Sequence, residues 1–131
     1  MNSKLQPKIK RQRLSFRHAF DGLKELWANE QNAHVHMAAT ILVIICGIVF
    51  HVSAMEWCVL LLTVGAVWSA EAMNSAVERV VDLAADGKIH PLAKASKDLA
   101  AGAVLIFAIV SVPIGLIIFL PKFITFLSSV F

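Results

Sequence analysis

Apolar residues in this chain fall into three long blocks that short polar segments separate. The blocks cover residues 37–50, 57–70 and 99–120. Together with apolar neighbours, each block is long enough to cross the hydrocarbon core of a bilayer as a helix. The pattern predicts three such helices, over residues 33–51, 55–84 and 91–120. It also predicts a kink in the third helix, at Pro113 and Gly115.

The segment before the first block shows a different pattern. Residues 1–12 are basic and without periodicity, which predicts a flexible arm at a membrane surface. Residues 13–28 carry apolar side chains at helical spacing with charged ones between them, which predicts an amphipathic helix. This helix either lies in the membrane interface or packs against the end of the bundle. Residues 29–36 are expected to form a polar joint after it.

Composition and charge indicate an all-α integral membrane protein with one domain, residues 1–131. Hydrophobic residues make up 58% of the chain, above the share typical of soluble proteins. Eleven of the twelve Lys and Arg residues lie before the first block or within residues 79–98, and the 51–56 loop has none. By the positive-inside rule, the N-terminus and the 79–98 region face the cytoplasm.

The stretch that follows the second block carries the most information. Four polar residues have spacings of 3, 4 and 4: Glu71, Asn74, Glu78 and Asp82. On a helix they lie within about 60° of one another and form one polar face, with Arg79 at its edge. Ionisable groups on a membrane-spanning helix are costly unless they face partners, water or an ion, so Glu71 is predicted to be functional. For Asp82 a solvated position is the simpler interpretation.

Candidate chemistry gathers at the predicted cytoplasmic end of the bundle. Glu71 is placed to act as a general base. Glu30 and Glu78 suit Mg²⁺, which takes one or two carboxylates and completes its shell with phosphate and water oxygens. Lys97 is able to meet a phosphate as a point charge. It shares a helix face with two charged neighbours, Lys94 and Asp98.

Other polar and small residues have simpler interpretations. His34 and His36 diverge at a spacing of two on a helix, so we interpret them as polar interface residues rather than metal ligands. Cys46 and Cys58 lie inside apolar blocks and are interpreted as packing residues. None of the six glycines belongs to a Gly-rich nucleotide-binding motif. Three helices alone would shield the carboxylates poorly, so a homo-oligomer is expected.

Two segments resemble the prokaryotic diacylglycerol kinase family of small three-span lipid kinases: EAMNSAVERVVD at residues 71–82 and HPLAKASKDLAAGAVL at residues 90–105. The resemblance covers about residues 13–122. The IHPLAK and FLPK segments are similar to its Gram-positive branch, the undecaprenol kinases. The resemblance implies a homotrimer in the bacterial cell membrane, with sites between protomers on the cytoplasmic side, and it implies ATP and Mg²⁺ as co-substrate and cofactor.

The resemblance also implies a role for each matching polar residue. Glu71 is the catalytic base, and Asn74 helps to shape the substrate site beside it. Glu30 and Glu78 hold Mg²⁺–ATP. Four further residues are expected to contact ATP: His18, His90, Lys97 and Asp98.

Two departures from the family pattern concern the turn and the substrate. The turn at residues 82–90 looks one residue longer than usual, which puts contacts by Lys88 and Ile89 in doubt. After Lys97 and Asp98 the chain has Leu-Ala-Ala, where the diacylglycerol-specific branch usually carries a serine. This favours a polyprenol acceptor. The leading hypothesis is therefore phosphorylation of undecaprenol by ATP, with diacylglycerol as the alternative acceptor.

Two hypotheses from other classes stay open on the sequence. A proton-coupled carrier would use Glu71 as its relay. A carrier should place acids near mid-membrane, however, whereas these acids cluster at one end with basic partners. A non-enzymatic membrane subunit would leave the polar face without a purpose.

Overall fold

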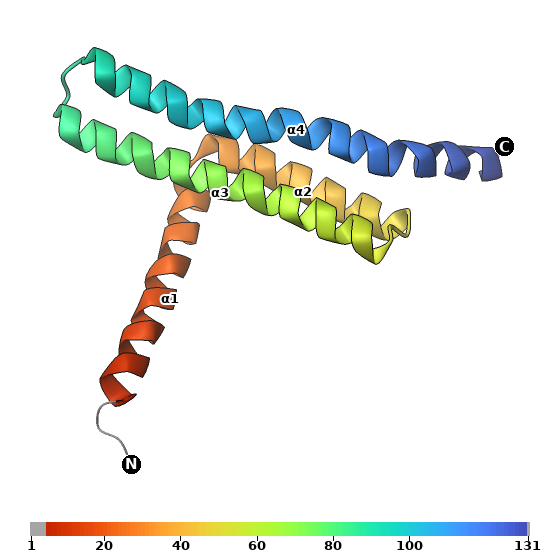
Figure 1. The fold of residues 1–131 in the computed structure, drawn as a ribbon, viewed down its shortest axis with the longest axis horizontal. Coiled ribbons are helices and arrows are strands. Elements are labelled where there is room, and N and C mark those ends of the chain that lie inside the picture. The colour runs from red at the N-terminus through yellow and green to blue at the C-terminus, as the bar shows by residue number, and fades with distance from the viewer. Residues whose placement is uncertain (1–4, 131) are drawn as a thin grey trace.

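Four helices make up the fold of this computed structural model, which describes the backbone of residues 5–130 and the side chains of residues 13–129. They are α1 (Leu5–Asn29), α2 (Gln31–Val49), α3 (Ala54–Ala85) and α4 (Pro91–Val130). The last three lie lengthwise beside one another, and α1 projects steeply away from them (Figure 1). Each of these three helices is long and apolar enough to cross a membrane, as the three apolar blocks predict.

The N-terminal helix begins earlier than predicted. The flexible arm assigned to residues 1–12 is wrong for residues 5–12, which belong to α1, while residues 1–4 lie outside the described residues. Lys, Arg, Gln and Leu dominate this stretch and are good helix formers. Pro7 stands in the first turn, where a helix does not need the missing N–H. Helix α1 is therefore longer than residues 13–28.

The polar joint between α1 and α2 is also much shorter than predicted. Only Glu30 is non-helical, with an extended backbone (φ −101°, ψ 119°). Its carbonyl accepts a hydrogen bond from the N–H of Ala33 at 3.2 Å. No proline or glycine interrupts the neighbouring turns, so the change of chain direction comes from this one extended residue. Glu30 thus connects α1 to α2. Figure 1 shows α1 leaving the bundle at this junction.

A capping box begins α3 at the opposite end of the bundle. The Ser53 N–H donates to Glu56 Oε2 at 2.6 Å, and the Glu56 N–H donates to Ser53 Oγ at 3.3 Å. These two bonds satisfy donors that a helix N-terminus otherwise leaves without partners. Lys122 of α4 pairs with Glu56 at 3.1 Å, which ties α4 to this corner.

The turn between α3 and α4 follows the sequence prediction. Asp86 (φ 48°) and Gly87 (φ 72°) both adopt left-handed backbone conformations, which end α3 after Ala85. Pro91 is the first residue of α4, where its fixed φ suits a helix start. The predicted helix start at residue 91 is confirmed, and α3 ends one residue beyond the predicted residue 84.

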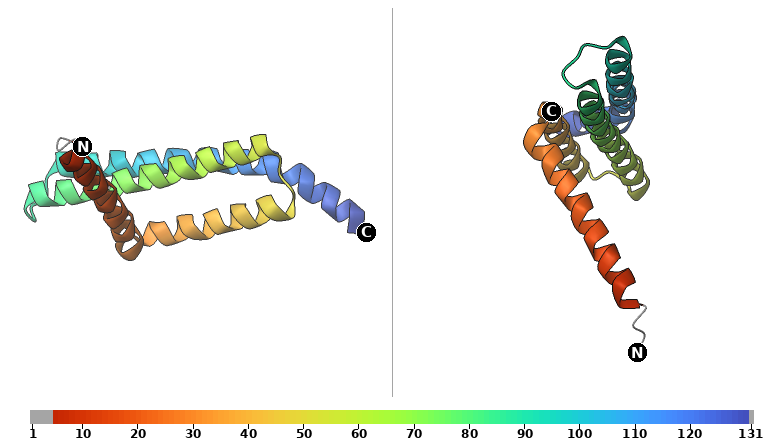
Figure 2. Two further views of the ribbon diagram at one scale, coloured as in Figure 1. Left: turned by 90° about the horizontal axis from the view of Figure 1, so that it is seen from below. Right: turned by 90° about the vertical axis from the view of Figure 1, so that its left-hand side faces the viewer.

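Helix α4 continues through Pro121, beyond the predicted end at residue 120. It reaches Val130 and extends past the α2–α3 turn (Figure 1). The extension places Phe123 and Phe126 against Phe50, with ring centroids 6.3 and 6.0 Å away. This packing offsets the hydrogen bond that Pro121 cannot make. Helix α4 passes through Pro113 without interruption, and its C-terminal part bends relative to the rest (Figure 2).

Packing within the described chain is sparse. The largest buried apolar cluster joins Val52, Leu60 and Ile118. Gly47 lies directly under the Trp57 indole, where an added Cβ would stand 2.5 Å from a ring carbon. Most large apolar side chains of the three long helices are instead exposed. Such a surface suits lipid or neighbouring copies rather than water.

Candidate active site

Glu71 is the largest fully buried side chain among the described residues, with 1% of its surface exposed. Asn74 and Ser75, within one turn of it, are also buried. Three polar atoms of this group have no hydrogen-bond partner: Glu71 Oε2, Asn74 Oδ1 and Ser75 Oγ. Each such atom costs about 1–3 kcal/mol if it stays unpaired. This concentration of unsatisfied groups marks a site where a ligand is expected.

The local sequence explains how this polar cluster forms. Helix α3 carries no glycine or proline between residues 66 and 85, so the polar face continues without a break from the apolar block. Glu71 and Asn74 face a cavity of about 260 Å³ between α2, α3 and α4, whereas Ser75 lines a separate hollow between α1 and α3. Small side chains of α4, Ala101 and Ala108, leave room on the opposite wall. The predicted position of Glu71 and Asn74 on one helix face is confirmed.

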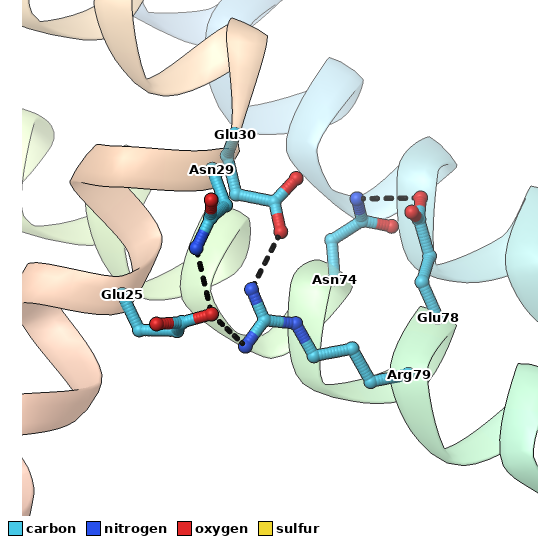
Figure 3. Close-up of polar contacts among 6 residues, drawn as sticks. All are labelled: Glu25, Asn29, Glu30, Asn74, Glu78 and Arg79. Carbon is cyan, nitrogen blue, oxygen red and sulfur yellow. Dashed lines mark hydrogen bonds and ion pairs between the residues drawn. The ribbon is translucent and has the colours of Figure 1, made fainter.

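Glu30 and Glu78 each bind a different partner in this structure. Arg79 donates to Glu30 Oε1 at 3.2 Å, and its other terminal nitrogen lies 3.4 Å from Glu25 Oε1. Asn74 Nδ2 donates to Glu78 Oε1 at 3.1 Å. Figure 3 shows both groups on neighbouring parts of α1 and α3. Arg79 thus neutralises Glu30 across two helices, rather than only bordering the polar face of its own helix.

The donor chemistry of Glu30 and Glu78 fits a magnesium ion that also binds phosphate. No group of three or more His, Cys, Asp or Glu residues able to hold a metal occurs in the described part of the chain. Mg²⁺ commonly takes only one or two carboxylates and fills its shell with phosphate and water oxygens. The hydrogen bonds to Glu30 and Glu78 each engage Oε1, which leaves Oε2 of both residues available as a hard ligand.

Charged residues near the α3–α4 turn form separate pairs. Lys97 donates to both oxygens of Asp82, at 2.9 and 3.1 Å. Lys94 pairs with Asp98 at 2.7 Å along α4. Asp82 stands 11 residues beyond Glu71, or about 16 Å along the helix, so these pairs are distant from the buried cluster. The hydrogen bond to Asp82 raises the pKa of Lys97, and the hydrogen bond to Asp98 raises the pKa of Lys94.

Two of the predicted nucleotide contacts stand apart from these pairs. His90 Nδ1 accepts a hydrogen bond from the Leu92 N–H at 3.1 Å and so caps the start of α4. His18 is exposed on α1 and makes no hydrogen bond or ion pair to any other described residue. The structure therefore does not bring His18 to the other candidate residues within one chain.

Sequence reasoning missed two residues near Glu71, which are Ser75 of the buried cluster and His36 of α2. Ser75 follows Glu71 by four residues, so helical periodicity alone was sufficient to include it. His36, interpreted from the sequence as an interface residue, instead lies on the cavity wall with Nε2 3.7 Å from Glu71 Oε2. No spacing within α2 carried this signal, because the contact depends on how α2 packs against α3.

Comparison with known proteins shows the family to which this chain belongs. Residues 17–119 match the family described as prokaryotic diacylglycerol kinase. The undecaprenol kinase of Bacillus subtilis (strain 168) is 50% identical over 108 residues, which cover 82% of this chain and 87% of that protein. The diacylglycerol kinase of Synechocystis sp. is 40% identical over 108 residues, or 82% of this chain and 62% of that protein.

A more distant relative is a lipid kinase as well. The diacylglycerol kinase of Escherichia coli (strain K12) is 33% identical over 95 residues, which cover 72% of this chain and 77% of that protein. These matches confirm the resemblance noted in the sequence and leave the carrier and non-enzymatic hypotheses without support. The chain belongs to the prokaryotic diacylglycerol kinase family and is a lipid kinase.

Proposed function

We propose that the protein transfers the γ-phosphoryl group of ATP to the hydroxyl of undecaprenol, in a Mg²⁺-dependent reaction at the cytoplasmic face of the bacterial cell membrane. The observation that carries the proposal is the buried carboxylate of Glu71, whose Oε2 has no hydrogen-bond partner, on a helix long and apolar enough to span a membrane. A carboxylate in such a position requires a partner, and the hydroxyl of a lipid supplies a proton donor at that depth.

Glu71 is the group that receives the hydroxyl proton. As the lipid oxygen forms its bond to the γ-phosphorus, the bond from that phosphorus to the β–γ bridging oxygen breaks and ADP leaves. The proton of the hydroxyl passes to the Glu71 carboxylate. Asn74 shapes the site beside it: its Nδ2 is bound to Glu78, and its buried Oδ1 is free to accept a hydrogen bond from substrate.

The charged residues nearer the cytoplasm bind the nucleotide. Glu30 and Glu78 would hold Mg²⁺, which offsets charge on the phosphates when bound. Lys97 contacts a phosphate, and Asp98, His90 and His18 complete the ATP contacts. Lys97 is paired with Asp82, so nucleotide binding exchanges one anionic partner for another.

A homotrimer completes the site. A single protomer leaves large apolar side chains of all three long helices exposed, such as Leu62 at 75% and Ile117 at 74%. His18 has no partner among the described residues of its own chain, so its ATP contact would need a neighbouring protomer. Both observations support sites that lie between protomers.

Undecaprenol is favoured over diacylglycerol as the acceptor on two grounds. The relative named undecaprenol kinase is more similar to this chain than the Synechocystis and Escherichia coli diacylglycerol kinases, at 50% against 40% and 33% identity. The residues after Lys97 and Asp98 are Leu99, Ala100 and Ala101. They offer no side-chain hydroxyl to the polar end of diacylglycerol. Diacylglycerol is the alternative acceptor.

Competition between the two lipids tests the proposal. Purified protein in mixed micelles receives labelled ATP, Mg²⁺ and equal mole fractions of undecaprenol and diacylglycerol, and the lipid products are separated by chromatography. We expect label mainly in undecaprenyl phosphate, and none without Mg²⁺. Label mainly in phosphatidic acid would establish the alternative acceptor, and product formation after metal chelation would contradict the Mg²⁺ requirement.

A further inference from the structure

A histidine lies beside the proposed base. His36 Nε2 is 3.7 Å from Glu71 Oε2, and the two side chains are 16% and 1% exposed. This separation exceeds a hydrogen bond, and Glu71 Oε2 has no other partner within the described chain. A movement of less than 1 Å would bring the pair to hydrogen-bond distance, and catalytic hydrogen bonds are often long before substrate binds.

The imidazole is held in place by a chain of contacts between α2 and α3. Trp68 of α3 packs against the His36 ring in an edge arrangement, with centroids 6.1 Å apart. The Trp68 indole N–H donates to Thr40 Oγ1 at 3.1 Å, and the Thr40 hydroxyl donates to the His36 carbonyl at 2.7 Å. Trp27 of α1 also packs against Trp68 in an edge arrangement, with ring centroids 6.5 Å apart. These contacts restrict the orientations that His36 can adopt.

The surroundings leave Glu71 as the natural partner of this imidazole. Both side chains line the 260 Å³ cavity, and no other residue that lines it is titratable. The remaining polar side chains of the wall are two amides, Asn32 and Asn74. A neutral imidazole with its proton on Nε2 donates one hydrogen bond, and an ionised carboxylate accepts it.

His36 also stands where the polar cavity meets an apolar one. A second cavity of about 280 Å³ lies farther along the bundle and is lined largely by apolar residues. Val35, His36 and Ala108 line both cavities. An acceptor with an apolar tail in the second cavity would therefore present its hydroxyl next to His36 and Glu71.

We propose that His36 is a positioning residue for Glu71, a role that rests on the proposed function. Its Nε2–H donates to Glu71 Oε2 and fixes the carboxylate, so that the other oxygen faces the hydroxyl of the lipid. His36 does not exchange a proton with the substrate. Its effect belongs to turnover rather than to nucleotide binding, because the nucleotide contacts lie nearer the cytoplasmic end of α3 and α4.

Two substitutions at this position test the proposal. His36→Leu removes the donor, whereas His36→Gln retains an amide N–H of similar reach. We expect His36→Leu to lower kcat on the order of 10–100-fold with KM for ATP unchanged, as for other losses of catalytic alignment. His36→Gln should recover most of that loss. His34→Leu, two residues away on the exposed side of α2, is the matched control and should match wild type.

The outcomes separate this inference from the proposed function. Thermal unfolding in detergent and size-exclusion elution establish that each variant keeps its fold and assembly. Wild-type kcat in His36→Leu, with Glu71→Gln inactive, would overturn the positioning role alone. Equal loss of kcat in His36→Gln and His36→Leu would overturn it as well, since the donor would then be irrelevant. An active Glu71→Gln would instead overturn the assignment of the base.

Discussion

Replacing Arg79 by glutamine should strengthen the binding of Mg²⁺ at Glu30. Arg79 donates to Glu30 Oε1 at 3.2 Å and also lies 3.4 Å from Glu25. The arginine therefore competes with any cation for the carboxylate of Glu30. Arg79→Gln removes the competing charge and keeps a polar side chain that can still donate a hydrogen bond.

The size of the effect follows from the exposure of the pair. The Arg79 side chain is 48% exposed and that of Glu30 is 24% exposed, so solvent screens their attraction. Ion pairs of this kind contribute about 0.2–1 kcal/mol. Releasing Glu30 from Arg79 should therefore lower the apparent Kd for Mg²⁺ by about 1.4- to 5-fold. The change should be largest at low ionic strength, where screening is weakest.

Initial rates over a Mg²⁺ titration at saturating ATP measure this effect. The matched control is Lys122→Gln, which removes a comparable pair with Glu56 at the opposite end of the bundle. We expect the control to leave the Mg²⁺ dependence of wild type intact. The competition would be refuted if Arg79→Gln needed more Mg²⁺ than wild type for its half-maximal rate, or if its KM for ATP rose. Either result would indicate that Arg79 itself binds the nucleotide.

Three further predictions concern packing, the metal and the topology. Gly47→Ala should lower stability by about 1–3 kcal/mol through overpacking, whereas Gly65→Ala, with open space around its Cβ, should be neutral or stabilising; unfolding in mixed micelles compares them, and equal stability would remove the packing argument. Glu30→Gln and Glu78→Gln should each raise the Mg²⁺ requirement, and the double variant should fall short of additivity; full additivity at unchanged Mg²⁺ dependence would separate the two residues. Lys88→Cys, in a background without native cysteines, should resist impermeant thiol reagents applied to intact cells, and labelling from outside would reverse the orientation.

Local sequence predicts those parts of the structure that depend on one helix at a time. The position of Glu71, Asn74 and Glu78 on one face follows from their spacing and from the absence of helix breakers between them. The end of α3 near Gly87 and the start of α4 at Pro91 follow from backbone preferences that act within a few residues.

Contacts between helices could not be predicted in the same way. The links from Arg79 to Glu30 and from His36 to Glu71 join residues 49 and 35 positions apart. They depend on the relative shift and rotation of α1, α2 and α3, which side-chain packing decides. The extension of α4 past Pro121 has a similar origin, because the aromatic contacts of Phe50 with Phe123 and Phe126 bring together α2 and α4. A proline read locally indicated a helix end that packing overrides.

The turnover of Glu71→Gln tests the central claim most directly. The amide keeps the size of the side chain at a position only 1% exposed, so the variant should fold and bind ATP with nearly wild-type affinity. Loss of the general base should lower kcat for undecaprenol phosphorylation by about 10²–10⁴-fold. Turnover near the wild-type value would contradict the account and remove Glu71 as the base.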